Sequence, residues 1–166
     1  MRILVAGFPY SGTTILRKVI GNHPDVFDYH ENETLRYPRG RGLAVLNRLL
    51  PYEYSGKKHV VYKIPRHNVE RGTNADRIIY IIKNPLDVFS SLQLRSGSIL
   101  PDSCAPVAWQ AYARYFLEKP IGRKHYKVRY EDLFGNDFAG LKMIFAWLGL
   151  DWDGSVLNTE SRFAPT

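Results

Sequence analysis

The chain has 166 residues, the length of one domain, and its 45% apolar and 23% charged residues exclude a disordered or fibrous protein. Lys and Arg outnumber Asp and Glu by 23 to 16, a formal net charge of +7, so we expect the ligand or partner to be an anion. The basic residues are scattered and form no recognisable nucleic-acid-binding module, which favours a nucleotide or phosphate ester over nucleic acid.

In the first half of the chain, short β-rich runs alternate with segments of helical apolar spacing, separated by Gly- and Pro-containing turns. These patterns predict, in order, a strand over 2–6, a helix over 13–20, a loop with little regular structure over 25–41, a short helix over 42–50 and a strand over His59–Ile64.

In the second half, the run Arg77–Ile82 is nearly all apolar and β-branched, which is typical of a strand buried on both faces. The patterns predict that strand, a helix over 85–94 with Asn84 as N-cap, a loop over 97–106, a helix over 107–118, a strand over His125–Arg129, and a last helix or helices over 131–148 ended by Gly149. Strands that alternate with helices predict an α/β fold, a three-layer α/β/α domain with about four parallel strands.

We expect no segment that directs the chain to a membrane or an oxidising compartment. No apolar run approaches the ~18 residues of a membrane-spanning helix, and residues 1–8 are too short for the apolar region of a signal peptide. The single Cys104 excludes an internal disulfide framework and a Cys-rich zinc site. We therefore expect a single domain over 1–166, cytoplasmic and without a membrane partner.

In a parallel sheet, ligands bind beyond the carboxyl ends of the strands. There, Gly7 to Thr14 (GFPYSGTT) has the G-x-x-x-x-G spacing of a phosphate-binding loop that opens a helix. The Lys that normally follows the second Gly is Thr13, so the usual cation for the β- and γ-phosphates of ATP is missing, which argues against a kinase or NTPase. An ordinary strand–turn–helix connection is the alternative interpretation.

A second candidate anion site follows the strand Arg77–Ile82. Lys83 stands at the strand tip, and Ser91 lies eight residues later in the predicted helix, on one face with Asp87. Lys83 and Ser91 could both reach one phosphate. A solvated strand end is the alternative.

Five motifs together resemble the sulfotransferases that use 3′-phosphoadenosine 5′-phosphosulfate (PAPS). GFPYSGTTILRKVIGNHPDVF resembles their 5′-phosphosulfate loop and following helix, and IIYIIKNPLDVFSSL resembles their 3′-phosphate segment. VAWQAYARYF is similar to their Trp-containing helix, YKVRYEDL followed by FAWLGL to a later segment, and YKIPRH to the K-x-P segment of the carbohydrate and tyrosylprotein branches. The motifs cover roughly residues 1 to 152 in family order.

The resemblance implies a P-loop NTPase-like sulfotransferase fold. It also implies transfer of a sulfuryl group from PAPS to an acceptor hydroxyl or amine, with release of 3′,5′-adenosine diphosphate and no metal. Ser11, Gly12, Thr13 and Thr14 would wrap the 5′-phosphosulfate, Lys83 and Ser91 would hold the 3′-phosphate, and Arg129 and Tyr130 would line the nucleotide site. Trp109 lies on an apolar helix face and is expected in the core rather than against the ligand.

For the base that accepts the acceptor's proton, the resemblance indicates a Glu soon after His-Pro. Counting without a gap gives Glu31, alignment on the E-T-R pattern gives Glu33, and His30 is a further candidate. We favour Glu31.

Two substitutions depart from the family pattern. Tyr10 stands where the loop usually has Lys or Arg, and we expect Lys63 to replace that cation, with Arg17 and Arg36 as the next candidates. Lys83 replaces an Arg and loses its bidentate fork, so weaker PAPS binding is expected.

Two other functions remain open: a non-catalytic module on the same fold that binds a nucleotide or a sulfated ligand, and a degenerate P-loop kinase. We expect the loops 25–41 and 97–106 to shape the acceptor pocket, and the first of them carries aromatic and cationic side chains that suit a sugar, a phenol or an acidic peptide as acceptor. The short chain favours an open acceptor cleft or its completion by a second copy, that is, a homodimer.

Overall fold

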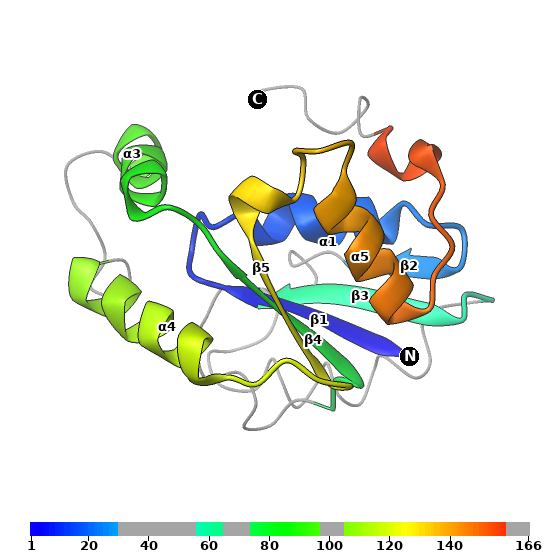
Figure 1. Ribbon diagram of the computed structural model, residues 1–166. Helices are drawn as coiled ribbons and strands as arrows, with labels where there is room; N and C mark the ends of the chain where they lie inside the picture. The colour runs from blue at the N-terminus through cyan, green and yellow to red at the C-terminus, as the bar shows by residue number, and fades with distance from the viewer. Residues whose placement is uncertain (30–55, 65–73, 97–104, 159–166) are drawn as a thin grey trace, which may run out of the picture.

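The computed structural model describes residues 1–29, 56–64, 74–96 and 105–158. Their centre is a parallel sheet of five strands in the order β2-β3-β1-β4-β5 (Figure 1). The strands are β1 (Arg2–Gly7), β2 (Val26–Asp28), β3 (His59–Ile64), β4 (Arg77–Ile82) and β5 (His125–Arg129).

The central strands are the most apolar because they are covered on both faces. In β1, the side chains from Ile3 to Ala6 are completely buried, and in β4 those from Ile78 to Ile81 are. The two strands pair in register, with Val5 opposite Ile79 and Gly7 opposite Ile81. The loops after β1, β3, β4 and β5 therefore leave the sheet at the same edge.

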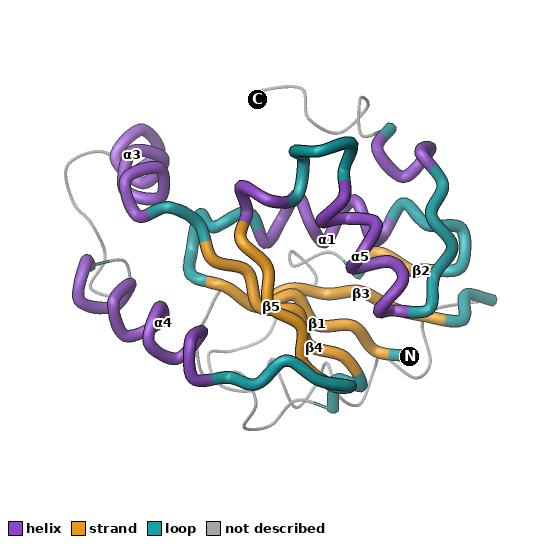
Figure 2. The backbone as a smooth tube through the Cα atoms, viewed as in Figure 1, coloured by secondary structure: helices purple, strands orange, loops and turns teal. Residues whose placement is uncertain are grey.

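Helices cover the two faces and make three layers (Figure 2). On one face, α1 (Thr13–Gly21) and α5 (Ala139–Leu148) enclose a cluster that includes Leu16, Ile79 and Phe145. On the other, α3 (Pro85–Ser96) and α4 (Pro106–Glu118) enclose a cluster that includes Tyr80, Leu92 and Tyr112. Two 3₁₀ turns complete the described fold: η3 (Tyr130–Asp132) and η4 (Gly154–Leu157).

The predicted three-layer α/β/α architecture is confirmed, and so are the bounds of the strands His59–Ile64, Arg77–Ile82 and His125–Arg129. Asn84 begins α3 as predicted, since its Oδ1 accepts a hydrogen bond from Leu86 N at 3.0 Å. Gly149 ends α5 in the left-handed conformation, with φ 70°. No helix in the described ranges is long and apolar enough to cross a membrane.

One prediction is wrong. The segment 25–41 is not loop throughout, because Val26–Asp28 pairs with β3 as a fifth strand, and the sheet exceeds the expected four. The helix or helices predicted over 131–148 are two pieces: η3 begins one residue earlier, and α5 starts only after three consecutive positive-φ residues, Asn136, Asp137 and Phe138. The helix predicted over 42–50 and most of the loop 97–106 lie outside the described residues.

Candidate functional site

The loop from Gly7 to Gly12 makes a tight turn between β1 and α1. Ser11 is completely buried, and both its backbone N–H and its hydroxyl donate to the carbonyl of Phe8, at 3.1 and 2.6 Å. Tyr10 has φ 66° and keeps 36% of its side chain exposed. Ser11 therefore shapes the loop, while Tyr10 faces outward at the position where a cation was missing from the motif.

The amino end of α1 is open to an anion. The first N–H groups of a helix have no acceptor within it and carry a partial positive charge. Gly12 stands at the N-cap, where it offers no side-chain cap, and the first turn, Thr13 to Ile15, contains no acidic residue. This is the arrangement that binds phosphate groups in strand–loop–helix units.

Lys63 brings a cation to this helix end. It lies on β3, which pairs directly with β1, and its register partner is Val5. From there the Nζ of Lys63 donates a hydrogen bond to Oγ1 of Thr14, at 2.5 Å. The partly buried ammonium thus lies at the first turn of α1, where the sequence analysis expected Lys63 to act.

Arg17, another candidate to replace the loop cation, is used elsewhere. Its side chain is only 1% exposed, and its Nη1 lies 2.7 Å from both Oδ1 of Asp28 and the carbonyl of Tyr29. Arg17 therefore fastens β2 to α1, and that prediction is corrected. Arg36 lies outside the described residues.

Lys83 lies on the other side of the loop, at the tip of β4. Its Nζ is 4.6 Å from the centre of the Tyr130 ring, a cation–π contact. The ring packs so closely on Gly12 that a Cβ built there would lie 2.3 Å from Tyr130 Cδ2. Burial raises the pKa of the Tyr130 phenol, and the carboxylates of Glu131 and Asp87 raise it further, so the phenol stays neutral at physiological pH.

Ser91 and Asp87 share a face of α3, as the spacing predicted. The hydroxyl of Ser91, however, donates to the backbone carbonyl of Asp87 at 2.8 Å. Its proton is thus engaged with the helix backbone. A joint contact of Ser91 and Lys83 with one phosphate stays a prediction.

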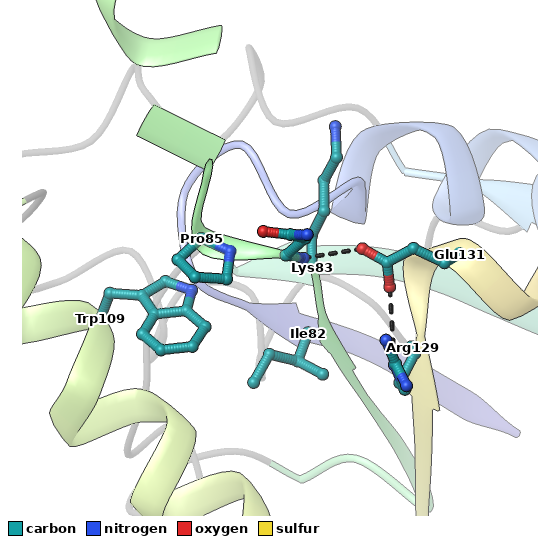
Figure 3. A pocket seen from close by; sticks show the side chains of 7 residues that line it. Ile82, Lys83, Pro85, Trp109, Arg129 and Glu131 are labelled. Atoms are coloured by element: carbon teal, nitrogen blue, oxygen red, sulfur yellow. Dashed lines mark hydrogen bonds and ion pairs between the residues drawn. The ribbon is translucent and has the colours of Figure 1, made fainter. Parts of the chain in front are cut away.

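A cavity of about 170 Å³ opens beside Lys83 (Figure 3). Trp109 from α4 forms one wall, and its indole Nε1 is buried without a hydrogen-bond partner among the described residues. Trp109 is partly buried and also packs against the apolar cluster beneath α3 and α4, as expected for a core residue. That it makes no contact with the ligand stays a prediction, because it borders the cavity as well. The full lining is Ile82, Lys83, Asn84, Pro85, Trp109, Arg129 and Glu131.

The opposite wall carries a carboxylate that the sequence analysis did not single out. Glu131 Oε1 accepts a hydrogen bond from the backbone N–H of Asn84 at 2.7 Å, and Oε2 lies 3.7 Å from Arg129 Nε. The dashed lines in Figure 3 mark both contacts. The Y-E-D motif was the only sequence signal for Glu131, and it does not reveal that its partner is Asn84, between β4 and α3.

The candidate bases His30, Glu31 and Glu33 lie outside the described residues. The strand that precedes them is described: β2 runs parallel to β3 and ends at the same edge of the sheet as β1. The next residue, Tyr29, is buried, and its N–H donates to the carbonyl of Val61 at 2.9 Å. Of the described residues, no group of three or more His, Cys, Asp or Glu is placed to hold a metal ion.

Comparison with solved structures identifies this architecture. The sulfotransferase domain of the Synechococcus PCC 7002 olefin synthase superposes over 100% of this chain and 78% of its own, with a TM-score of 0.66 and 19% identity. The chain has the sulfotransferase fold. No protein-family model and no curated protein matches the sequence.

Two further structures share the sulfotransferase fold. The sulfotransferase domain of the curacin biosynthetic pathway covers 93% of this chain and 76% of its own, with a TM-score of 0.64 and 16% identity. Mouse sulfotransferase SULT7A1, solved in complex with PAP, covers 97% of this chain and 62% of its own, with a TM-score of 0.60 and 21% identity.

Proposed function

We propose that this protein is a PAPS-dependent sulfotransferase, which transfers a sulfuryl group to a hydroxyl or amine and releases 3′,5′-adenosine diphosphate. The observation that carries the proposal is the pair of cations beside the open end of α1. Lys63 reaches Thr14 from β3, and Lys83 lies on Tyr130 at the tip of β4. Because β1 lies between β3 and β4, the two ammonium groups flank the loop.

PAPS has two anionic ends, which match these two positions. The 5′-phosphosulfate would bind at the open end of α1, against Lys63 and the loop residues Tyr10, Ser11, Gly12, Thr13 and Thr14. The 3′-phosphate would bind Lys83 and Ser91, and Arg129 and Tyr130 would border the nucleotide. The sulfotransferase fold supports this, since mouse SULT7A1 on the same fold is complexed with PAP.

In the proposed reaction, the acceptor oxygen or nitrogen attacks sulfur. The bond between sulfur and the bridging oxygen breaks, and its electron pair passes to the 5′-phosphate of the released 3′,5′-adenosine diphosphate. Lys63 and the first-turn amides of α1 would stabilise the charge that develops there. The acceptor's proton would pass to a base on the segment after β2, with Glu31 favoured over Glu33 and His30.

Thermal unfolding with nucleotides tests the proposal. A ligand at a hundred times its dissociation constant adds about 2.7 kcal/mol to the free energy of unfolding. We expect 3′,5′-adenosine diphosphate to raise the melting temperature, and 5′-AMP, the isomeric 2′,5′-adenosine diphosphate and Mg-ATP to raise it much less. No shift with millimolar 3′,5′-adenosine diphosphate would overturn the proposal, and a shift with Mg-ATP alone would indicate a kinase.

A second candidate is a non-catalytic module that binds the same nucleotide or a sulfated ligand. Tyr10 favours it, because an exposed phenol at this loop position cannot neutralise charge on the transferred group. The two functions separate when PAPS is supplied with a panel of sugars, phenols and acidic peptides. Release of 3′,5′-adenosine diphosphate with a sulfated product supports the enzyme. Tight binding of PAPS without turnover on any acceptor supports the module.

A further inference from the structure

Glu131 and Asn84 connect the tips of two neighbouring strands beyond the end of the sheet ladder. The last register pair between β4 and β5 is Ile82 with Arg129. Two residues further, where the chain enters α3 on one side and η3 on the other, the Glu131 carboxylate accepts the Asn84 N–H at 2.7 Å. A side chain here takes the place of a ladder carbonyl.

Three groups of Asn84 form hydrogen bonds. Its N–H donates to Glu131, its Oδ1 accepts from Leu86 N at 3.0 Å, and its carbonyl accepts from Val88 N at 3.1 Å. The residue before it is Lys83. The hydrogen bond from Asn84 to Glu131 therefore holds the end of β4, from which Lys83 projects. Glu131 is also next in sequence to Tyr130, whose ring Lys83 contacts.

A carboxylate is an unexpected residue beside a site for an anion. By Coulomb's law, Glu131 repels a phosphate at Lys83, so its removal would tighten binding if charge were its only effect. Arg129 compensates part of that charge, with its Nε 3.7 Å from Oε2 of Glu131. The Glu131 side chain is also 32% exposed, so its charge is partly screened by water.

We infer that Glu131 is a positioning residue for the 3′-phosphate of the nucleotide: by holding the Asn84 amide, it fixes Lys83 against Tyr130. This inference rests on the proposed function. It assigns to Glu131 a role that depends on the reach of its side chain and on an acceptor oxygen, and not on its charge.

Substitutions that separate reach from charge test the inference. Glu131→Gln keeps the reach and an acceptor oxygen but loses the charge, whereas Glu131→Asp keeps the charge but shortens the side chain. We expect Glu131→Asp and Glu131→Ala to weaken binding of 3′,5′-adenosine diphosphate about fivefold, as for the loss of an ordinary hydrogen bond. We expect Glu131→Gln to bind it as the native protein does, and all variants to bind 5′-AMP unchanged.

Asp132→Ala is the matched control, because it removes the neighbouring exposed carboxylate without touching Asn84. Titration calorimetry gives the affinities, and melting without ligand shows whether each variant folds. The inference is overturned if Glu131→Gln binds 3′,5′-adenosine diphosphate more weakly than the native protein, or if Glu131→Asp binds it with native affinity. Equal affinity of the native protein for 3′,5′-adenosine diphosphate and 5′-AMP would overturn the proposed function instead.

Discussion

Lys63 and Thr14, 49 positions apart in the sequence, are joined by a hydrogen bond of 2.5 Å at the amino end of α1. The bond holds the ammonium at this helix end, where the proposed function puts the charge that develops on the leaving 5′-phosphate. Removal of a comparable preorganised donor lowers enzyme turnover by about 10²- to 10³-fold. We therefore expect Lys63→Ala to lower the rate of 3′,5′-adenosine diphosphate release from PAPS by that factor.

The control for this prediction is Lys58→Ala. Lys58 precedes β3 at the opposite edge of the sheet, where its 72% exposed side chain pairs with Asp25. Equal rates for Lys63→Ala and the native protein would show that Lys63 has no part in the transfer. Equal losses in Lys63→Ala and Lys58→Ala would point to a general effect of net charge.

Tyr10 and Lys63 are expected to be coupled. If Lys63 supplies the cation that the loop lacks, Tyr10→Lys restores activity to Lys63→Ala and changes the native protein little. A double-mutant cycle on the turnover rate should give a coupling of at least about 1 kcal/mol. Tyr10→Gln, which adds no charge, is the control. A large gain from Tyr10→Lys in the native background would show that the native loop is deficient in charge.

Gly12→Ala is expected to destabilise the protein for two reasons. The residue has φ 94°, which is strained for alanine, and the added Cβ would meet Tyr130 Cδ2 at 2.3 Å. Gly149→Ala adds only the backbone strain, since Gly149 has φ 70° and a Cβ there would have no neighbour within 4 Å among the described residues. Urea unfolding should show a loss of about 1 kcal/mol for Gly149→Ala and clearly more for Gly12→Ala. Equal losses would mean that the Tyr130 ring moves aside freely.

The buried pair of Arg17 and Asp28 should contribute strongly to the docking of β2. Because the two side chains are only 1% and 13% exposed, loss of Asp28 leaves a buried guanidinium without its counter-charge. We expect Asp28→Ala to lower the free energy of unfolding by about 3 kcal/mol, and Arg17→Leu with Asp28→Leu to recover much of it. A urea midpoint of Asp28→Ala equal to that of the native protein would contradict this.

His59 makes the stability depend on pH. Burial lowers the pKa of His59 below its ordinary value of 6.5, and the N-terminal ammonium lowers it further. Its Nδ1 is buried without a hydrogen-bond partner among the described residues. The unfolded chain binds the proton more readily, so the stability present above pH 6.5 is lost as the pH falls through the folded pKa.

His59→Gln should flatten this part of the stability curve. Urea unfolding between about pH 7.5 and pH 5 measures the slope. In that window Asp25 and Asp76 do not contribute, since hydrogen bonds from Lys58 to Asp25 and from Arg2 to Asp76 keep the pKa of each below 3.8. An unchanged slope in His59→Gln would assign the pH dependence to another group.

The long apolar strands and the helices around them were predictable because their signals are local. The apolar, β-branched composition of Arg77–Ile82 is enough to predict a buried strand. The backbone preferences of Asn84-Pro85 and of Gly149 predict where helices begin and end. The three residues of β2 are too few to show an alternation. They form a strand because β3 supplies the hydrogen bonds and Arg17 pairs with Asp28, neither of which is visible in residues 26–28 themselves.

The sequence by itself determined a parallel α/β sheet, a loop after β1 with the spacing of a phosphate-binding loop, and Lys63 and Lys83 as the candidate cations. Only the tertiary structure decided where these cations and the remaining groups lie. Strand order places β3 beside β1, which brings Lys63 to Thr14. It places β2 beside β3, where Asp28 pairs with the buried Arg17, and β5 beside β4, where Glu131 accepts the N–H of Asn84. The physical reason is that patterns record the burial of a residue along its own segment, whereas pairings between segments arise only when the strands assemble.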